Sequence, residues 1–363
     1  MKFQQDAATT QQGKPGLGAA IFAGLTTYAM LAKRRRRLHL HEASAGRASD
    51  GRGRAASSPG EIPARGWWDI VMRTKDDVSR NNLSLIAAGA AFYGFLAIPS
   101  AITALVSLYG LMFDPRGVQR QVEAMRGLLP DDAIKLISGQ LQTLASHSNS
   151  TLGIGLVMSL ALALWSARSG ISSMITALNI VYGEAEKRGY LRLQLAALGL
   201  TAGAVLSALI ALALIAVLPA ALSAVPLGGA GKTIAALVRW PILIALVTVA
   251  LAAIYRFAPS REEPKWRWVS WGAVAATILW IIASALFSLY VGRFASYDKS
   301  YGSLGAVVVL LMWIYLSAFV VLFGAQLNAE IEHQTARDST TGSSRPLGQR
   351  GALMADTVGS QAK

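Results

Sequence analysis

The sequence predicts an all-α fold, a polytopic membrane bundle of six transmembrane helices. Hydrophobic residues make up 53% of the chain and charged residues only 15%, which is more apolar surface than one soluble domain buries. Windows without Lys, Arg, Asp or Glu cover residues 84–113, 136–167, 193–231, 240–255, 268–292 and 300–329. About 20 apolar residues cross the hydrocarbon core of a bilayer, so these windows are the predicted spans. Their continuous Ala and Leu content, without alternation, argues against lipid-facing strands.

The first predicted unit, residues 1–65, is a basic, largely disordered cytoplasmic arm. It contains the run Arg34 to Arg37 and is otherwise rich in Ala, Ser and Gly, a composition that builds no core. The chain has a net charge of +14, and we expect the arm to attract anionic lipids rather than to bind nucleic acid specifically, since no nucleic-acid motif accompanies it. Inside the arm, the uncharged residues 16–32 are either a seventh span or a signal-like or interfacial segment.

The second unit, residues 66–332, holds the six spans. We expect Pro99 to interrupt the first helix, and the connection 114–150 to form two short external amphipathic helices. Pro219 and Pro226 are expected to end the third helix, in which the spacing of Gly199 and Gly203 favours close helix packing. The fourth window has only 16 residues, so its flanking arginines must reach opposite interfaces, helped by Trp240 and Tyr255.

Basic residues in the connections predict the topology. The second connection carries Arg168, Lys187, Arg188 and Arg192, and the fourth carries Arg256, Arg261, Lys265 and Arg267. The third and fifth carry two basic residues each, so connections two and four are predicted to be cytoplasmic. Both termini then lie in the cytoplasm, including the third unit, residues 333–363, which we expect to be a disordered tail.

Four polar residues at or near the spans are the strongest functional candidates: Arg168, Asn179, Asn328 and Glu330. Ionisable and amide groups at membrane depth are costly unless they face partners or a wet cavity. Because Arg168 and Glu330 lie at the ends of predicted spans, an interfacial position is the alternative for these two.

Three segments together, in order, resemble one family. AAGAAFYGFLAIPSAI (87–102), LWSARSGISSMITALNIVYGEAEKRGYLR (164–192) and YDKSYGSLGAVVVLLMWIYLSAFVVLFGAQLNAEIE (297–332) are similar to the YihY/virulence factor BrkB family, over roughly Gly66 to Glu332. The resemblance implies a bacterial inner-membrane protein with about six helices. It also implies functional or packing roles for Tyr93, Pro99, Asn179, Tyr182, Glu186, Arg188, Tyr301, Gly302, Gly305, Gly324, Asn328 and Glu330. This chain departs from the family at Gln326, where members often carry Glu.

The family's older ribonuclease label finds no support in the residues. A zinc hydrolase needs a cluster of His and Asp ligands, and the chain has only His39, His41, His147 and His333. With no phosphate-binding glycine loop and no serine elbow, we expect no enzyme activity, no metal and no cofactor. Two hypotheses remain: a protein that transports or flips a lipid or envelope precursor, and a scaffold for envelope integrity that transports nothing. A ribonuclease is a remote third.

Overall fold

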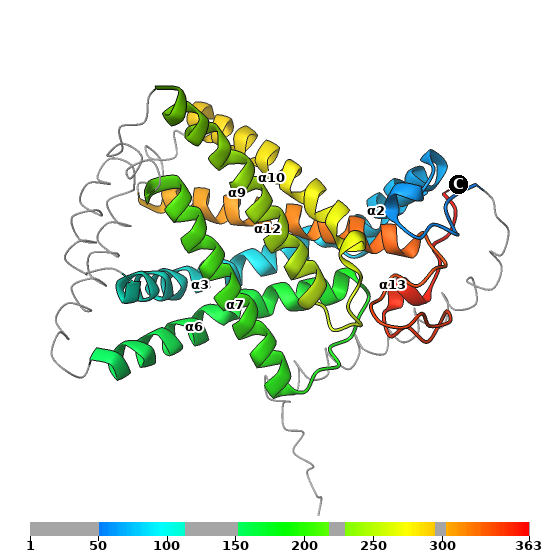
Figure 1. Cartoon of the computed structure of the whole chain (residues 1–363), viewed down its shortest axis with the longest axis horizontal. Coiled ribbons are helices and arrows are strands. Elements are labelled where there is room, and N and C mark those ends of the chain that lie inside the picture. The colour runs from blue at the N-terminus through cyan, green and yellow to red at the C-terminus, as the bar shows by residue number, and fades with distance from the viewer. Residues whose placement is uncertain (1–50, 113–151, 218–228, 295–302, 363) are drawn as a thin grey trace, which may run out of the picture.

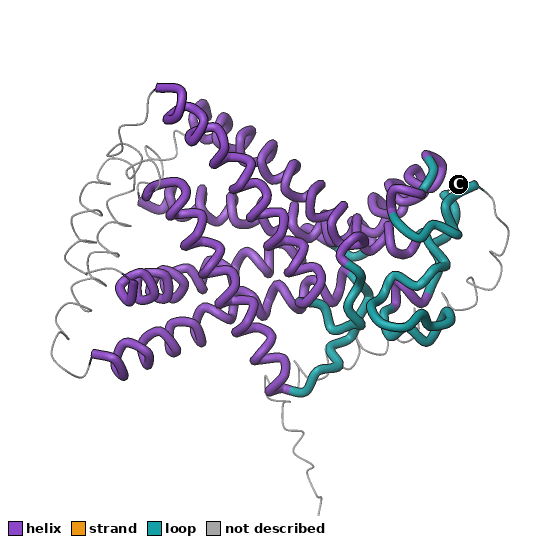
Figure 2. Tube along the Cα trace, viewed as in Figure 1, coloured by secondary structure: helices purple, strands orange, loops and turns teal. Residues whose placement is uncertain are grey.

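Long helices that converge at one end make up the structure (Figure 1). The computed structural model describes residues 51–112, 152–217, 229–294 and 303–362. Within these ranges there is no strand, as Figure 2 shows, so the predicted all-α membrane bundle is confirmed. The elements are η1 (Pro59–Glu61), α2 (Ala64–Arg80), α3 (Leu83–Met112), α6 (Leu152–Val181), α7 (Tyr190–Leu212), the π-helical turn η2 (Ala213–Val217), α9 (Gly229–Phe257), α10 (Trp266–Phe294), α12 (Ser303–His333) and α13 (Leu353–Asp356).

Five described helices are long and apolar enough to cross a membrane. These candidate spans are Leu83–Ile102, Tyr190–Ile215, Leu237–Phe257, Trp266–Arg293 and Val307–His333. The short fourth window is thus part of a longer helix, because α9 continues through Pro241. The second predicted span falls on α6, which is not one of these five candidate spans. The count of six spans therefore stays a prediction.

The second helix extends beyond the end of its predicted window. α6 continues to Val181, so Arg168 lies inside the helix and not in the predicted cytoplasmic connection. The prediction was wrong because a charge was taken as the end of a span. Pro99 likewise lies inside α3, which is continuous from Leu83 to Met112 and is not interrupted.

α12 is the central helix and contacts α10, α3, α2, α6 and α13. It crosses α10 so closely that a Cβ on Gly272 would lie 2.3 Å from the carbonyl oxygen of Gly324. The predicted Gly199 and Gly203 contact does not occur within the described chain, because nothing lies within 4 Å of a Cβ at either position. α7 instead buries Ala197, Thr201 and Val205.

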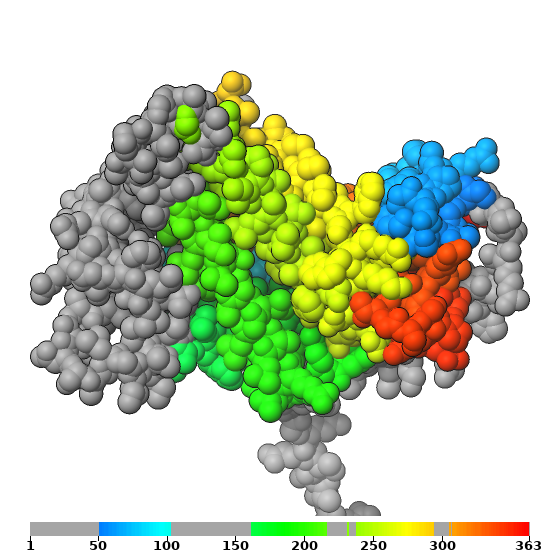
Figure 3. Space-filling view, viewed as in Figure 1, coloured from blue at the N-terminus to red at the C-terminus, as the bar shows by residue number. Residues whose placement is uncertain are grey.

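The helices converge at what we call the polar end, made of residues 51–82, the connections 182–189 and 258–265, and the tail 334–362. Figure 3 places α2 and the tail side by side there, and Figure 2 shows most of the loops at this end. The predicted cytoplasmic connections and both described ends of the chain therefore share one side of the bundle. That this side is cytoplasmic stays a prediction.

Two segments expected to be disordered are packed at the polar end. The tail buries Thr335, Ser339 and Arg350, and the amide of Ala336 donates to the carbonyl of Arg54 at 2.8 Å. The end of the arm, residues 51–62, packs against this tail, with the Thr335 hydroxyl donating to the Ala56 carbonyl at 2.6 Å. Composition was a poor guide because hydrogen bonds, more than apolar burial, order these residues. Residues 1–50, 113–151, 218–228 and 295–302 lie outside the described chain, and with them the predictions for the segment 16–32, the external helices, Pro219 and Pro226.

Candidate functional site

Six of the predicted site residues meet at or next to the polar end. Asn179, Tyr182, Asn328 and Glu330 are buried there, and Glu186 and Arg188 lie in the connection that follows α6. Their partners come from α2, from α10 and from the connection 258–265, and the neighbouring Glu184 accepts a hydrogen bond from the tail. The site is therefore a junction between segments far apart in the sequence.

Glu330 is a buried, paired carboxylate in the last turn of α12. Its Oε2 accepts a hydrogen bond from Arg73 Nε at 2.5 Å, and the two side chains are 1% and 10% exposed. The Arg73 guanidinium also donates to Gln334 Oε1 at 2.7 Å and to the carbonyl of Ser360 at 2.8 Å. His333 Nδ1 lies 3.5 Å from Glu330 Oε2. Arg73 thus connects α2, the last turn of α12 and the tail.

The amide at Gln326 has a specific neighbour, Asp77 of α2. Gln326 Nε2 donates to Asp77 Oδ2 at 3.4 Å, and its Oε1 accepts from Asn81 Nδ2 at 3.2 Å. Burial, together with the neighbouring Glu330 carboxylate, raises the pKa of Asp77 to about 7. A glutamate at position 326 would add a third carboxylate beside Asp77 and Glu330. The neutral amide of Gln326 avoids this additional repulsion between like charges.

A second buried ion pair lies on the other side of α12. Arg261 donates to Glu332, and the two side chains are only 1% and 2% exposed. The Arg261 guanidinium also lies 4.1 Å from the centre of the Tyr182 ring, a cation–π contact. Tyr182, predicted from the family resemblance, is fully buried in this contact.

Asn179 and Glu186 hold the two connections together. Asn179 Oδ1 accepts from the amide of Ser260 at 2.7 Å, and its Nδ2 donates to Glu186 Oε2 at 3.0 Å. Arg188 Nε donates to Glu186 at 2.8 Å and its Nη2 to the carbonyl of Ala258 at 2.8 Å. Although burial acts to raise it, hydrogen bonds from Arg188 and Asn179 hold the pKa of Glu186 at about 2.

Asn328 ties α12 to α10. Its Oδ1 accepts from the amide of Gly272 at 2.8 Å, and its Nδ2 donates to the carbonyl of Val269 at 3.0 Å. A Cβ on Gly324 would lie 2.6 Å from the Ala276 Cβ, which explains the glycine one turn earlier. Both residues therefore serve a close helix crossing.

Three predicted residues lie away from the polar end, on α3 and α6. A Cβ on Gly170 would lie 3.2 Å from the Ala97 Cβ, so this part of α6 packs against the candidate span Leu83–Ile102 of α3. Arg168 therefore lies at the depth of that span, which also contains Tyr93 and Pro99. The Arg168 guanidinium lies 4.2 Å from the centre of the Trp165 ring. Its Nε is buried and has no hydrogen-bond partner among the described residues. Tyr93 is 51% exposed on the bundle surface.

The remaining predicted positions lie in or before α12. Gly305 is buried near the start of that helix, at the end opposite Glu330. Tyr301 and Gly302 fall outside the described residues. The structure therefore does not bring all the predicted positions together.

Sequence reasoning missed the basic partners Arg73 and Arg261, and with them Asp77 and Glu332. A signal for α2 was present, because Gly66, Asp69, Ile70, Arg73, Thr74 and Asp77 recur at helical spacing on one face. No local signal matched Arg73 to an acid 257 positions away.

The site can hold the bundle closed at this end. Four acidic side chains, Asp69, Glu184, Glu330 and Glu332, are buried and each lies within an ion pair to Arg or Lys. In the part of the chain that the structure describes, no group of three or more His, Asp or Glu could hold a metal ion. The arrangement suits a mechanical junction.

The chain matches a described family and several curated proteins. The family described as virulence factor BrkB matches residues 74–347. The ribonuclease-like protein YfkH of Bacillus subtilis is 34% identical over 206 residues, 55% of this chain and 73% of that protein. A UPF0761 membrane protein of Rhodospirillum centenum is 25% identical over 314 residues, 85% of this chain and 66% of that protein. Another, from Idiomarina loihiensis, is 35% identical over 95 residues, 26% of this chain and 33% of that protein. No solved structure matches the chain.

Proposed function

The chain belongs to the virulence factor BrkB family of membrane proteins, and from this premise we propose that it moves an anionic lipid or envelope precursor across the bacterial inner membrane. The substrate is anionic because the proposed contact inside the membrane is an arginine. The polar end would face the cytoplasm, as the basic connections predict.

Arg168 is the observation that carries this proposal. α6 continues for 13 residues beyond it, about 20 Å of helix, before the chain reaches the polar end. An arginine at such depth is expensive unless it meets a counter-charge, water or a ligand. No carboxylate within ion-pair distance of Arg168 is found among the described residues. Trp165 covers one side of the guanidinium, which leaves its donors for a phosphate or carboxylate of the substrate.

The polar end supplies the second part of the proposal, a closed gate. Arg73 with Glu330 and Arg261 with Glu332 join α12 to α2 and to the connection 258–265. Transport requires a seal on one side while the substrate enters from the other. In Figure 1 the helices diverge away from this end, which fits entry from the opposite side.

A scaffold without transport is the second candidate, and one observation favours it. The side-chain amides of Asn179 and Asn328 each accept one hydrogen bond and donate one, between helices and connections. Such contacts fit residues that hold the bundle together. Catalysis has weaker support, since the name of the Bacillus subtilis relative, ribonuclease-like, describes that relative and no described residue of this chain has been tied to such a reaction.

Transbilayer movement of fluorescent lipids in proteoliposomes tests the proposal. Labelled phosphatidylglycerol and phosphatidylethanolamine are compared in wild-type, Arg168→Ala and Arg239→Ala vesicles, with dithionite quenching the outer leaflet. Arg239 is a matched control, because its guanidinium also lies over a tryptophan, 5.4 Å from the Trp240 ring centre. We expect accelerated movement of the anionic lipid that only the Arg168→Ala variant loses. Rates equal to those of empty vesicles would favour the scaffold, and an unaffected Arg168→Ala variant would remove this residue from the path.

A further inference from the structure

The outer face of α2 exposes two large apolar side chains among basic and other polar residues. Its inner face buries Asp69, Ile70 and Arg73 against α10, α12 and neighbouring segments. On the outer face, Trp68 is 59% exposed and Val71 is 48% exposed. Two large apolar side chains on neighbouring turns therefore lack a partner within the described chain.

Trp67, the residue before Trp68 on α2, shows where this helix lies along the bundle. The rings of Trp67 and Trp271 lie with centroids 5.5 Å apart. Trp271 belongs to the first turns of the candidate span Trp266–Arg293 and is itself 48% exposed. The apolar edge of α2 therefore lies at the level where α10 enters the membrane.

Exposed basic residues accompany this edge. Arg65 and Lys75 are exposed on the same outer face as Trp68, one turn before it and two turns after it. Tryptophan is enriched where hydrocarbon meets headgroups, and basic residues attract anionic headgroups at the same level. This combination is typical of helices that lie in the plane of a membrane surface.

We propose that α2 is an interfacial helix that binds an anionic lipid leaflet. Trp68 and Val71 enter the boundary between headgroups and acyl chains, and Arg65 and Lys75 contact lipid phosphates. Because α2 also carries Arg73 and Asp77, the same helix connects the leaflet to the junction at Glu330. This inference does not depend on whether the protein transports anything.

Spin labels on single cysteines test the proposal in the full-length protein. The chain contains no cysteine, so each label reports one site. Labels replace Trp68 and Val71, and a third replaces the exposed Asp76 on another flank of α2. Ile281, exposed in the span of α10, is the lipid reference, and Ser343, exposed in the tail, is the water reference. The protein is placed at one copy per nanodisc of phosphatidylethanolamine and phosphatidylglycerol.

The proposal predicts that labels at positions 68 and 71 collide with oxygen severalfold more than with a nickel chelate, as at position 281. The label at position 76 should collide with the nickel chelate about as readily as the label at the water reference, position 343. Preference for the chelate at both test positions would show a water-facing helix and overturn the proposal. Low accessibility to both reagents would show that protein covers this face, which also overturns it. Val71→Cys keeps Trp68 in place, so loss of the tryptophan cannot explain a negative result.

The basic residues are tested separately. In the Val71→Cys background, the double change Arg65→Gln and Lys75→Gln should move the label toward water in discs that contain phosphatidylglycerol. In discs of phosphatidylcholine alone the same change should have little effect. Equal behaviour in both kinds of disc would overturn the assignment of Arg65 and Lys75 to anionic headgroups.

Discussion

Arg73 and Glu330 form a buried ion pair at 2.5 Å although they are 257 positions apart in the sequence. The pair joins the helix before the first span to the last turn of the last span. Because the side chains are 10% and 1% exposed, loss of either one leaves the other as an uncompensated buried charge.

Replacing Arg73 with alanine should therefore destabilise the protein by about 3 kcal/mol, within the range for breaking a buried pair. Thermal unfolding in detergent measures this. The control is Arg80→Ala, since Arg80 is 55% exposed and its contact with Asp77 should contribute less than about 1 kcal/mol. The double change Arg73→Met and Glu330→Met should be milder than Arg73→Ala, and equal losses in Arg73→Ala and Arg80→Ala would contradict this account.

Asp77 should make stability fall as the pH rises. Its pKa is raised from an ordinary 3.8 to about 7, so the folded state holds a proton that the unfolded state has lost between these values. Asp77→Asn should flatten the dependence and stabilise the protein above pH 7 by about 2 kcal/mol, allowing for solvent screening. Unfolding midpoints between pH 5 and 8 check this, with the exposed neighbour Asp76→Asn as control. A wild-type profile that rises across this range would be inconsistent with the prediction.

The crossing of α10 and α12 should not accept a methyl group. A Cβ at Gly272 would lie 2.4 Å from the Asn328 Cγ and closer still to the Gly324 carbonyl. Gly272→Ala should therefore destabilise by about 2 kcal/mol through overpacking. Gly199→Ala and Gly203→Ala meet open space and should be neutral or slightly stabilising because alanine favours helix. The same unfolding assay separates the two groups, and equal effects would refute the packing argument.

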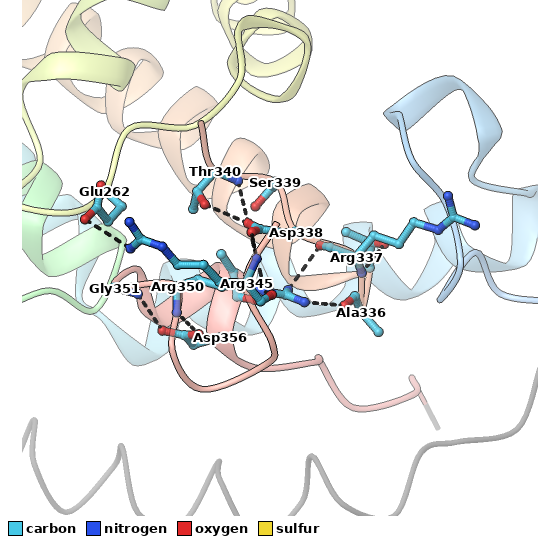
Figure 4. A network of polar contacts seen from close by, with 12 residues as sticks. Glu262, Ala336, Arg337, Asp338, Ser339, Thr340, Arg345, Arg350, Gly351 and Asp356 are labelled. Carbon is cyan, nitrogen blue, oxygen red and sulfur yellow. Dashed lines mark hydrogen bonds and ion pairs between the residues drawn. The ribbon is translucent and has the colours of Figure 1, made fainter. Parts of the chain in front are cut away.

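The tail should detach when Arg350 is removed. Figure 4 shows its guanidinium among backbone carbonyls, and it donates to those of Ala336 at 2.7 Å and Ala355 at 2.6 Å. Its side chain is 5% exposed. Arg350→Ala should lower the local stability of the tail by about 2 kcal/mol, since charged donors are lost.

Hydrogen exchange measures this at the Leu353 amide, which donates to Glu184 at 2.6 Å. The control is Arg345→Ala, because Arg345 is 45% exposed and contacts a half-exposed Glu262 at 3.4 Å. Faster exchange at residues 350–357 only in the Arg350→Ala variant is expected. Unchanged protection in that variant would show that the tail does not depend on this cluster.

The sequence predicted the helices well because a bilayer demands long apolar runs. It failed at the boundaries of α6, where Arg168 looked like the end of a span but lies within the helix. It also failed for the tail, whose polar composition resembles a disordered segment. Residues such as Arg350 and Asp356 are buried there through hydrogen bonds, which hydropathy does not detect.

The site was predictable in part. Asn179 and Glu330 stood out as polar groups next to apolar runs, and the resemblance added Glu186 and Arg188. The basic partners of Glu330 and Glu332 were not predictable, because Arg73 and Arg261 lie far from these acids along the chain. Pairings of this kind come from the packing of helices and leave no pattern in the local sequence.

Thiol labelling beside Arg168 tests the central claim, that this arginine contacts a substrate inside the membrane, which requires that it can be reached from the side opposite the polar end. The variant Ser169→Cys and the lipid-facing reference Ile281→Cys are exposed to a membrane-impermeant thiol reagent in sealed proteoliposomes, from each side in turn. We predict that Ser169→Cys reacts from the side opposite the polar end, while Ile281→Cys reacts only after denaturation. If Ser169→Cys is as unreactive as Ile281→Cys from both sides, the bundle is dry at this depth and the transport account is contradicted.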